Sequence, residues 1–359
     1  MTVARSQHTP LPQAPSALQA LLRQARLQGA SDLHLRSNAP PWWRVHGHMH
    51  PMMDEAAPQA VIPHDHLQAW LETLLPAQDM AALRQGHSLD TAWHWPELGR
   101  YRVNAFLCDA GLGLVLRCIS NNAPTLASLS VPAAVTGLLA GAGLVLVTGP
   151  TGSGKSTTLA AMVAHLNAHT SSHIITLEDP IEFLHTSAQS LITQREMGRD
   201  TPDFAQALRA ALREDPDVLL IGEMRDLDTI RLALTAAETG HLVLASLHSR
   251  HATSAVERIL DVFDGSEKAL VRTQLADVLS GVLSQRLVPC AEGSQRCALY
   301  ELLIATPAIR HLIREGKTPQ IASAMQTGAA QGMVTFGQAQ AEAERAGRIA
   351  RGQAQASAG

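Results

Sequence analysis

A short run of residues near the middle of the chain could bind phosphate. Its pattern is G-x-x-x-x-G-K-[ST], in which glycines let the main chain approach phosphate oxygens closely. The lysine would reach the β- and γ-phosphates of a nucleotide, and the next hydroxyl would bind Mg²⁺. The residues of this loop are Gly149, Pro150, Thr151, Gly152, Ser153, Gly154, Lys155, Ser156 and Thr157.

The residues around this loop predict the strand and the helix that such a loop requires. Residues 144–147 read Leu-Val-Leu-Val, which is typical of a buried parallel strand, and residues 158–163 are mostly helix formers. The helix would point its free N–H groups and the positive end of its dipole at the phosphates. The alternative is a glycine-rich loop that matches by accident, and the two flanks argue against it.

Two acidic residues follow predicted buried strands. Glu178 follows the strand at 173–177, and Glu223 comes two residues after the apolar run at 218–221. In a parallel sheet these positions lie at the ligand-binding edge. Glu178 would hold Mg²⁺ through water or orient the attacking water, and Glu223 would polarise that water or anchor Mg²⁺ through water. A helix cap or a turn in solvent is the alternative for each.

Two histidines flank the predicted strand at 242–245. They are His241 and His248, seven residues apart, so in a straight strand they lie on opposite faces. At least one could approach the γ-phosphate, although a histidine beside an apolar strand is more often packed or hydrogen-bonded. The chain has no Asn-Lys-x-Asp stretch to read guanine, so we expect ATP rather than GTP.

A second group of histidines superficially resembles a metal site because its first members alternate in sequence, as residues on one face of a strand do, although Gly47 suggests a turn there. No carboxylate or cysteine completes a ligand set, so we expect no metal there. These histidines are His46, His48, His50, His64 and His66.

The composition is that of a soluble globular protein with two domains: 359 residues, 46% hydrophobic and 17% charged. The net charge of −4 argues against broad nucleic-acid binding. The sequence lacks both an apolar run long enough for a transmembrane helix and the core of a signal peptide, so a cytoplasmic location is expected. Four cysteines without C-x-x-C spacing are expected to be buried thiols: Cys108, Cys118, Cys290 and Cys297.

The pattern of elements divides the chain into two domains. We expect a flexible N-terminus at 1–16, a small α+β domain at 17–120, a linker at 121–129, an α/β domain at 130–345 and a flexible tail at 346–359. The second domain alternates strands and helices, which predicts a doubly wound parallel sheet. Residues from 250 to about 286 are expected to be helical, followed by a strand near 297–303.

Several further stretches resemble the motifs of secretion-superfamily ATPases, and in particular the twitching-motility, PilT-type retraction ATPases of type IV pili. The similarity covers about residues 17–345. The stretches that carry it, besides the loop, are Gly29–Leu35, Arg102–Phe106, Thr176–Phe183, Ala211–Asp217, Gly222–Asp226, Thr235–His241 and Ala308–Glu315. Two departures are Ser246–Arg250, in place of a threonine-rich stretch, and His311, in place of asparagine.

The resemblance implies an α/β fold with a PAS-like N-terminal domain followed by a RecA-like, doubly wound P-loop ATPase domain, assembled as a hexameric ring. It implies that Lys155 and Ser156 bind phosphate and Mg²⁺. The resemblance places Glu178 in a motif called the Asp box, makes Glu223 the catalytic acid, and places His241 and His248 in a motif called the His box. It also implies that Arg102 and Arg117 reach ATP from the N-terminal domain. Arg195 and Arg199 are implied as a second arginine pair.

The segment Ala308–Glu315 resembles the C-terminal signature helix of the retraction ATPases. Its apolar residues Ile309, Leu312 and Ile313 form one helical stripe that would pack on the core. The charged residues outside the stripe would be exposed and contact the ring or the membrane platform: Arg310, Arg314 and Glu315.

The implied function is a motor that hydrolyses ATP to power pilus retraction by pilin disassembly. Its implied partners are further copies of itself, an inner-membrane platform protein and a paralogous retraction ATPase, at the cytoplasmic face of the inner membrane. The alternatives are a pilus-assembly or type II secretion-like motor, an accessory ATP-binding subunit and a nucleic-acid translocase. The missing C-x-x-C zinc motif argues against an assembly or secretion motor, and the intact Lys155 and Glu223 argue against an accessory subunit. The acidic net charge argues against a nucleic-acid translocase.

Overall fold

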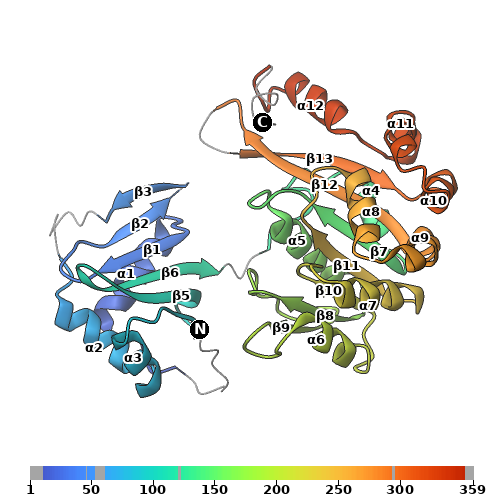
Figure 1. Ribbon diagram of the computed structural model, residues 1–359. Helices are drawn as coiled ribbons and strands as arrows, with labels where there is room; N and C mark the ends of the chain where they lie inside the picture. Colours follow the sequence, from blue (N-terminus) through green and yellow to red (C-terminus); the bar gives the residue numbers. More distant parts are fainter. Residues whose placement is uncertain (1–10, 46, 53–60, 120–122, 293–295, 352–359) are drawn as a thin grey trace. The chain divides into compact units, whose positions relative to one another are not determined.

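Figure 1 shows the computed structural model, which describes residues 11–45, 47–52, 61–119, 123–292 and 296–351. The chain divides into two units, residues 1–121 and 122–359. Each unit is built on its own sheet, with spatial strand order β3-β2-β1-β6-β5-β4 in the first and β13-β12-β7-β11-β10-β8-β9 in the second. In the described part of the chain, no helix combines the length and apolar character needed to cross a membrane.

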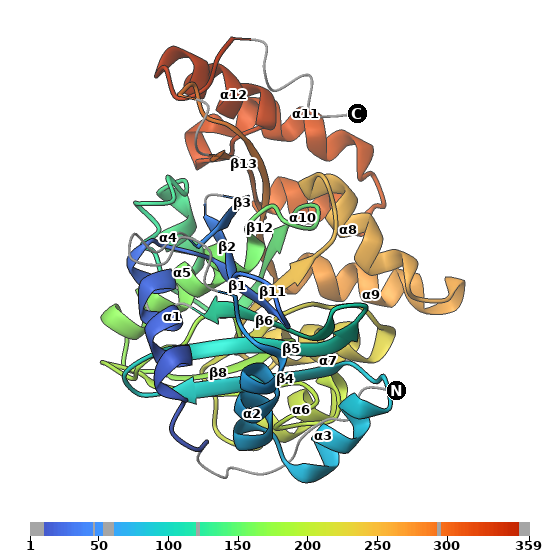
Figure 2. The same cartoon turned by 90° about the vertical axis from the view of Figure 1, so that its left-hand side faces the viewer.

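The first unit is a six-stranded antiparallel sheet with its helices packed on one face (Figure 1). Leu33, Leu35, Leu114 and Leu116 point to that face at alternate positions and are buried against the helices. The helices α2 and α3 pack against each other and lie side by side in both views (Figure 2). The elements are α1 (Ser16–Leu27), β1 (Asp32–Arg36), β2 (Trp42–Val45), β3 (His48–Pro51), α2 (His64–Leu74), α3 (Ala77–Arg84), β4 (Leu89–Trp95), β5 (Gly99–Cys108) and β6 (Gly111–Ile119).

The second unit is a seven-stranded sheet covered on both faces. Six strands are parallel, and β13 runs antiparallel at one edge. Successive residues of β7 and β11 are buried on opposite faces, which explains their uninterrupted apolar sequences. The strands are β7 (Gly143–Thr148), β8 (His173–Glu178), β9 (Leu191–Glu196), β10 (Val218–Ile221), β11 (Leu242–Leu247), β12 (Leu279–Pro289) and β13 (Arg296–Ile304).

The helices of the second unit form two layers and a C-terminal group. α4 and α5 pack on one face of the sheet, and α6 to α9 pack on the other. α12 lies along β13 (Figure 2). The helices are α4 (Ala134–Leu138), α5 (Lys155–His169), α6 (Phe204–Ala211), α7 (Leu227–Glu238), α8 (Ala252–Asp261), α9 (Gly265–Val278), α10 (Pro307–Arg314), α11 (Pro319–Thr327), the 3₁₀-helix η1 (Gly328–Gln331) and α12 (Phe336–Arg345).

The expected helix up to residue 286 is wrong at its end, because residues 279–289 form β12. Leu279, Val282 and Leu283 are spaced i, i+3, i+4, which imitates a helix. Here they are buried because helices cover both faces of β12: Leu279 and Val282 pack in the core on one face of the sheet, and Leu283 packs in the core on the other. The spacing of apolar residues cannot distinguish these two cases.

The expected flexible ends are shorter in the structure than in the sequence analysis. Within the N-terminal segment, Ala14 is buried in the core of the first unit, and Trp95 Nε1 donates to the main-chain oxygen of Pro12. Within the C-terminal segment, Ile349 is buried and Arg348 N donates to Ala343 O. Residues 1–10 and 352–359 lie outside the described residues.

The expectation of four buried thiols is wrong for two of them. Cys290 and Cys297 form a disulfide across the end of the β12–β13 hairpin, where their Cα atoms are 5.2 Å apart. Pairing of β12 with β13 brings them within reach of each other, which their spacing in sequence does not reveal. Cys108 and Cys118 are free and half-buried.

Candidate active site

The phosphate-binding loop connects β7 to α5. A β-carbon at Gly149 would lie 2.3 Å from the main-chain oxygen of Gln285, so a larger residue would displace β12. Gly154 directly precedes α5 and has a φ of 87°, a conformation that side chains disfavour. In the first turn of α5, the N–H groups have no acceptor within the helix. This combination of close main chain and free donors fits an anion such as a phosphate group.

Lys155 lies at the centre of the site. Its Nζ donates to the main-chain oxygens of Gly149 at 3.0 Å and Pro150 at 3.2 Å, and lies 3.4 Å from Nδ1 of His248. Burial lowers the pKa of Lys155, while the carboxylates of Glu223 and Glu182 oppose that shift. Lys155 is thus half-buried, in contact with the main chain of the loop and under the influence of the carboxylate of Glu223.

Glu223 is held by two cationic or potentially cationic side chains. Its Oε1 lies 3.1 Å from Nε2 of His248, and its Oε2 lies 2.7 Å from a guanidinium nitrogen of Arg225. Burial alone would raise the pKa of Glu223, but the hydrogen bonds and charges of Arg225 and His248 lower it below its ordinary value. Glu223 is therefore ionised at neutral pH, and His248 connects it to Lys155.

Glu178 ends β8 in a more enclosed setting. One of its oxygens accepts hydrogen bonds from Thr176 Oγ1 at 2.7 Å and from Gln194 Nε2 at 3.1 Å. Burial raises its pKa to about 7, and these two hydrogen bonds only partly oppose that shift. Glu178 therefore exchanges a proton near neutral pH, whereas Glu223 does not.

The strands place the two acids next to each other at one edge of the sheet. Gly222 N donates to Leu177 O at 2.7 Å, which joins the ends of β10 and β8. A β-carbon at Gly222 would lie 3.3 Å from Cα of Glu178. The structure thus brings Lys155, Glu178, Glu223 and His248 to the carboxyl ends of neighbouring parallel strands. Ser156 lies in the first turn of α5 at the same edge, with its side chain exposed.

His241 lies at the opposite edge of this sheet. It precedes β11, whereas His248 follows it. The six extended residues of β11 span roughly 20 Å, so the two histidines lie about that far apart. Nδ1 of His241 lies 2.9 Å from Ala236 O and 3.1 Å from Thr239 Oγ1. Within this chain, the two histidines of the expected His box do not meet at one site.

Each arginine of the pair in the second unit is engaged with an acid. Arg195 donates two hydrogen bonds, of 2.9 and 2.8 Å, to the carboxylate of Glu214, and Glu214 O lies 3.0 Å from the ring of His173 at the amino end of β8. Arg199 contacts Asp200, and that hydrogen bond raises the pKa of Arg199. Arg195 thus reaches toward the amino end of β8, whereas Arg199 follows β9 at the edge where Glu178 lies.

Arg102 and Arg117 lie in the first unit, directly opposite each other on β5 and β6. Nε of Arg117 lies 2.8 Å from the carboxylate of Asp32, which is 5% exposed, and Arg102 lies 3.9 Å from Asp90. Both arginine side chains remain about half exposed, at 45% for Arg102 and 66% for Arg117. They therefore form a cross-strand cationic pair on the sheet face opposite the helices.

The helix that resembles the retraction signature is α10, and both of its arginines contact the end of α9. Ile309 and Ile313 are buried and Leu312 is partly buried. The guanidinium of Arg310 donates to Ala305 O and to the last carbonyl groups of α9. Arg310 is half-buried, so the expectation that it is exposed is wrong, because carbonyls at a helix end attract a cation. Arg314 contacts Asp277 and is exposed, and Glu315 is exposed.

The sequence analysis missed several residues of the site. Arg225 and Thr176 stood inside quoted stretches without a role, and Gln194 and Gln285 were given none. Of these, Arg225 has a local signal, because it comes two residues after Glu223. Of the histidines that superficially resemble a metal site, His46 lies outside the described residues, and no group of three or more potential ligands gathers within those residues.

Comparison with known proteins agrees with the motifs. The chain matches the model of a family described as type II/IV secretion system protein over residues 10–348. The uncharacterized protein YggR of Escherichia coli (strain K12) is 51% identical, over 89% of this chain and 95% of that protein. The type IV pilus retraction ATPase PilT of Pseudomonas aeruginosa is 47% identical, over 88% of this chain and 90% of that protein.

A solved structure gives the same result. The crystal structure of the pilus retraction motor PilT with bound ADP matches with a TM-score of 0.86 at 40% identity, and covers 95% of this chain and 97% of that one. The resemblance to PilT-type ATPases that the motifs predict is confirmed. The chain belongs to the type II/IV secretion system protein family.

Proposed function

We propose that this chain hydrolyses ATP at the carboxyl edge of its seven-stranded sheet and uses the free energy to retract type IV pili by disassembling pilin. The observation that carries the proposal is the connected set Lys155, His248 and Glu223, which joins the phosphate-binding loop to an ionised acid. The similarity to retraction ATPases over most of the chain supports the choice of retraction.

The residues of the site suit phosphoryl transfer to water. The loop N–H groups and Lys155 would bind the β- and γ-phosphates. Glu223 is ionised, so it can accept a proton from the attacking water, and His248 and Arg225 fix its orientation.

A Mg²⁺ ion also fits this donor set. Ser156 offers a hydroxyl at the start of α5, and Glu178 and Glu223 offer carboxylates from β8 and from the turn after β10, all oxygen ligands of the kind that Mg²⁺ prefers. When bound, Mg²⁺ would neutralise charge on the phosphates. Glu178 and Glu223 would then contact it through water.

We infer that the first unit is PAS-like and the second RecA-like, and that six copies form a ring. The parallel sheet with a phosphate-binding loop at its carboxyl edge supports the second assignment. Arg102 and Arg117 would then supply positive charge to ATP from the first unit, since their exposed fork-shaped guanidinium groups suit phosphate. A movement of that unit would move these arginines relative to ATP, and this would couple hydrolysis to movement.

The cellular setting follows from the same proposal. The ring would lie in the cytoplasm at the inner membrane and act on a membrane-embedded platform protein, with a paralogous retraction ATPase as a further partner. The exposed side chains His311, Arg314 and Glu315 of the α10 region are the candidate contact with such partners.

Deletion of the gene from its source organism tests the proposal. Excess surface pili that no longer retract would support retraction. Loss of surface pili would instead support an assembly motor. Absence of ATP turnover by the purified protein, with ATP binding retained, would point to an accessory ATP-binding subunit.

A further inference from the structure

Gln285, on β12, touches the phosphate-binding loop from the side opposite Glu223. Its side chain is buried, with 1% of its surface exposed, and its Nε2 donates to the main-chain oxygen of Ser153 at 2.5 Å. This contact joins a strand to the loop across more than 130 residues of sequence. Buried main-chain oxygens need such a donor, because solvent cannot replace it.

The contact extends beyond one hydrogen bond. The main-chain oxygen of Gln285 is the atom that a β-carbon at Gly149 would approach to 2.3 Å, and a β-carbon at Gly154 would lie 3.1 Å from its Nε2. The first residue of the loop, its Ser153 and the residue before Lys155 therefore all pack on Gln285. A shift of this residue would move both ends of the loop.

Two buried polar atoms at this contact have no hydrogen-bond partner within the described residues. They are Oε1 of Gln285 and Oγ of Ser153. Buried polar atoms of this kind normally pair, so an unpaired acceptor and an unpaired hydroxyl on two touching residues leave an interaction available to them.

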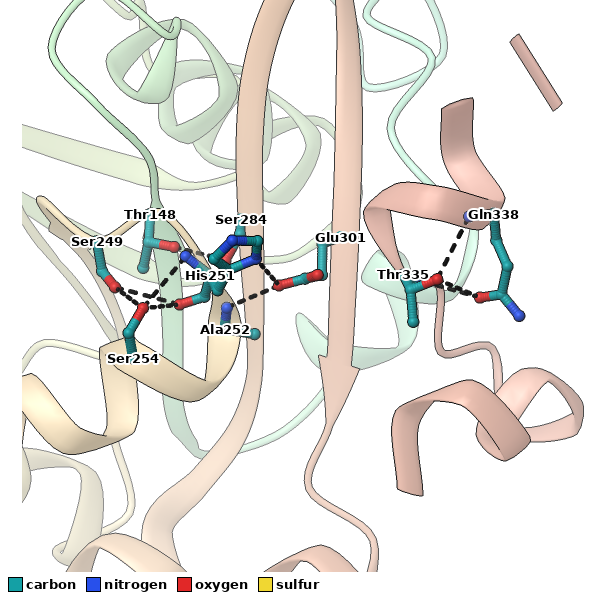
Figure 3. Close-up of polar contacts among 9 residues, drawn as sticks. All are labelled: Thr148, Ser249, His251, Ala252, Ser254, Ser284, Glu301, Thr335 and Gln338. Atoms are coloured by element: carbon teal, nitrogen blue, oxygen red, sulfur yellow. Dashed lines mark hydrogen bonds and ion pairs between the residues drawn. The ribbon is translucent and has the colours of Figure 1, made fainter. Parts of the chain in front are cut away.

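The strand that carries Gln285 is fixed on both sides. Figure 3 shows the hydroxyl groups of Thr148 on β7 and Ser284 on β12, which are 2.7 Å apart, and Glu301 on β13, which accepts from Ala252 N at 2.9 Å. On the other side of Gln285, the Arg286 guanidinium lies 4.7 Å from the centre of the Phe336 ring of α12. Gln285 thus lies on β12, and contacts on both sides of this residue fix the position of that strand.

We propose that Gln285 is a positioning residue for the phosphate-binding loop. Its amide holds Ser153 and so sets the direction of the loop N–H groups and of Lys155 toward the phosphates. It does not touch the reacting atoms, so its loss weakens nucleotide binding more than it slows the chemical step. This inference rests on the proposed nucleotide site.

Two variants separate positioning from packing. Gln285→Met is close to glutamine in size but cannot donate to Ser153. Gln285→Glu keeps the shape but repels the Ser153 oxygen when ionised, and it can donate again when protonated. Burial should raise the pKa of that carboxyl, so its donor returns as the pH falls from 8 to 6.

The probe is ADP, titrated onto the full-length protein, together with KM and kcat for ATP. We expect Gln285→Met to weaken ADP binding about tenfold and to raise KM similarly, while kcat changes less than about threefold. The ADP affinity of Gln285→Glu, relative to that of the wild type at the same pH, should recover as the pH falls. Gln340→Met is the matched control, because Gln340 on α12 contacts the neighbouring Arg286 and not the loop.

ADP affinity of Gln285→Met equal to that of the wild type would overturn the inference, even if the variant melts at a lower temperature. A ratio of the Gln285→Glu affinity to the wild-type affinity that does not change with pH would also overturn it, and this ratio decides the matter if Gln285→Met does not fold. A different result would show that the proposed function itself is wrong. The wild-type protein would then bind no ADP, or Lys155→Ala would bind ADP as well as the wild type does.

Discussion

At the carboxyl end of β11, the imidazole of His248 contacts both Lys155 and Glu223, whereas at the amino end the imidazole of His241 contacts a main-chain oxygen and a threonine hydroxyl. The amino edge has polar pairs of its own, such as His173 N donating to Asp217. The two edges thus carry similar residue types. The carboxyl edge differs because the glycine-rich loop and the start of α5 place a lysine and free N–H groups beside its acids.

The comparison shows that position in the sheet decides what a polar residue can do. At the carboxyl edge the charges are held in contact with one another around the start of a helix. At the amino edge the same residue types hold the main chain together. The predictions below test this difference, beginning with the largest effect.

Replacing Lys155 should have the largest effect. Lys155→Ala should abolish productive nucleotide binding, because phosphate charge at the loop would lack its nearest cation. A titration with ATP and ADP, compared with the wild type, measures this. Unchanged ATP affinity would mean that this loop is not the nucleotide site.

Removing the charge of Glu223 should separate binding from turnover. Glu223→Gln keeps the shape of the side chain but cannot accept a proton, so turnover should fall 10²-fold or more while ATP still binds. Steady-state ATP hydrolysis and ATP binding are measured on the same preparation. Turnover near the wild-type rate would exclude Glu223 as the catalytic acid.

Arg102 and Arg117 test whether the first unit contributes to hydrolysis. Arg102→Ala and Arg117→Lys should each lower turnover about tenfold, with a smaller effect on ATP affinity. Lysine is preferred at position 117 because a cation there pairs with the buried Asp32. Arg84→Ala is the matched control, since Arg84 is an exposed arginine of the same unit that pairs with Glu72. Normal turnover in both variants would confine the chemistry to the second unit.

Glu178 should make stability depend on pH in a defined direction. Burial raises its pKa to about 7, above the 4.5 of a free glutamate, so the folded state keeps a proton that the unfolded state releases. Its contribution is therefore favourable at low pH and is lost as the pH rises from about 5 to 8. Glu178→Gln should remove this loss, which is roughly 1–3 kcal/mol. Urea unfolding of both proteins across this range measures it, and parallel pH profiles would contradict the pKa shift.

Much of the site could be predicted because its signals are local. The loop, Glu178 and Glu223 each follow a buried strand directly, and the structure gathers these residues at one edge. The contact of Gln285 with Ser153 could not be predicted, because it depends on β12 lying beside β7. The disulfide likewise depends on the pairing of β12 with β13.

The edge strands show the same limit. β4, at one edge of the first sheet, and β9, at one edge of the second, were not expected. β9 is an edge strand with a largely polar sequence, so it lacks the apolar run that identifies its neighbours. His241 was placed in the site because the resemblance assigns it to the His box. The resemblance does not specify at which end of β11 each histidine lies.

The most direct test of the account compares His248→Ala with His241→Ala in steady-state ATP turnover. Both variants remove an imidazole at an end of β11, and melting temperatures confirm that both are folded. We expect turnover to fall about tenfold or more in His248→Ala, because Glu223 and Lys155 lose the group that joins them, and to stay within about twofold of the wild type in His241→Ala. Equal losses, or the larger loss in His241→Ala, would contradict the claim that hydrolysis takes place at the carboxyl edge alone.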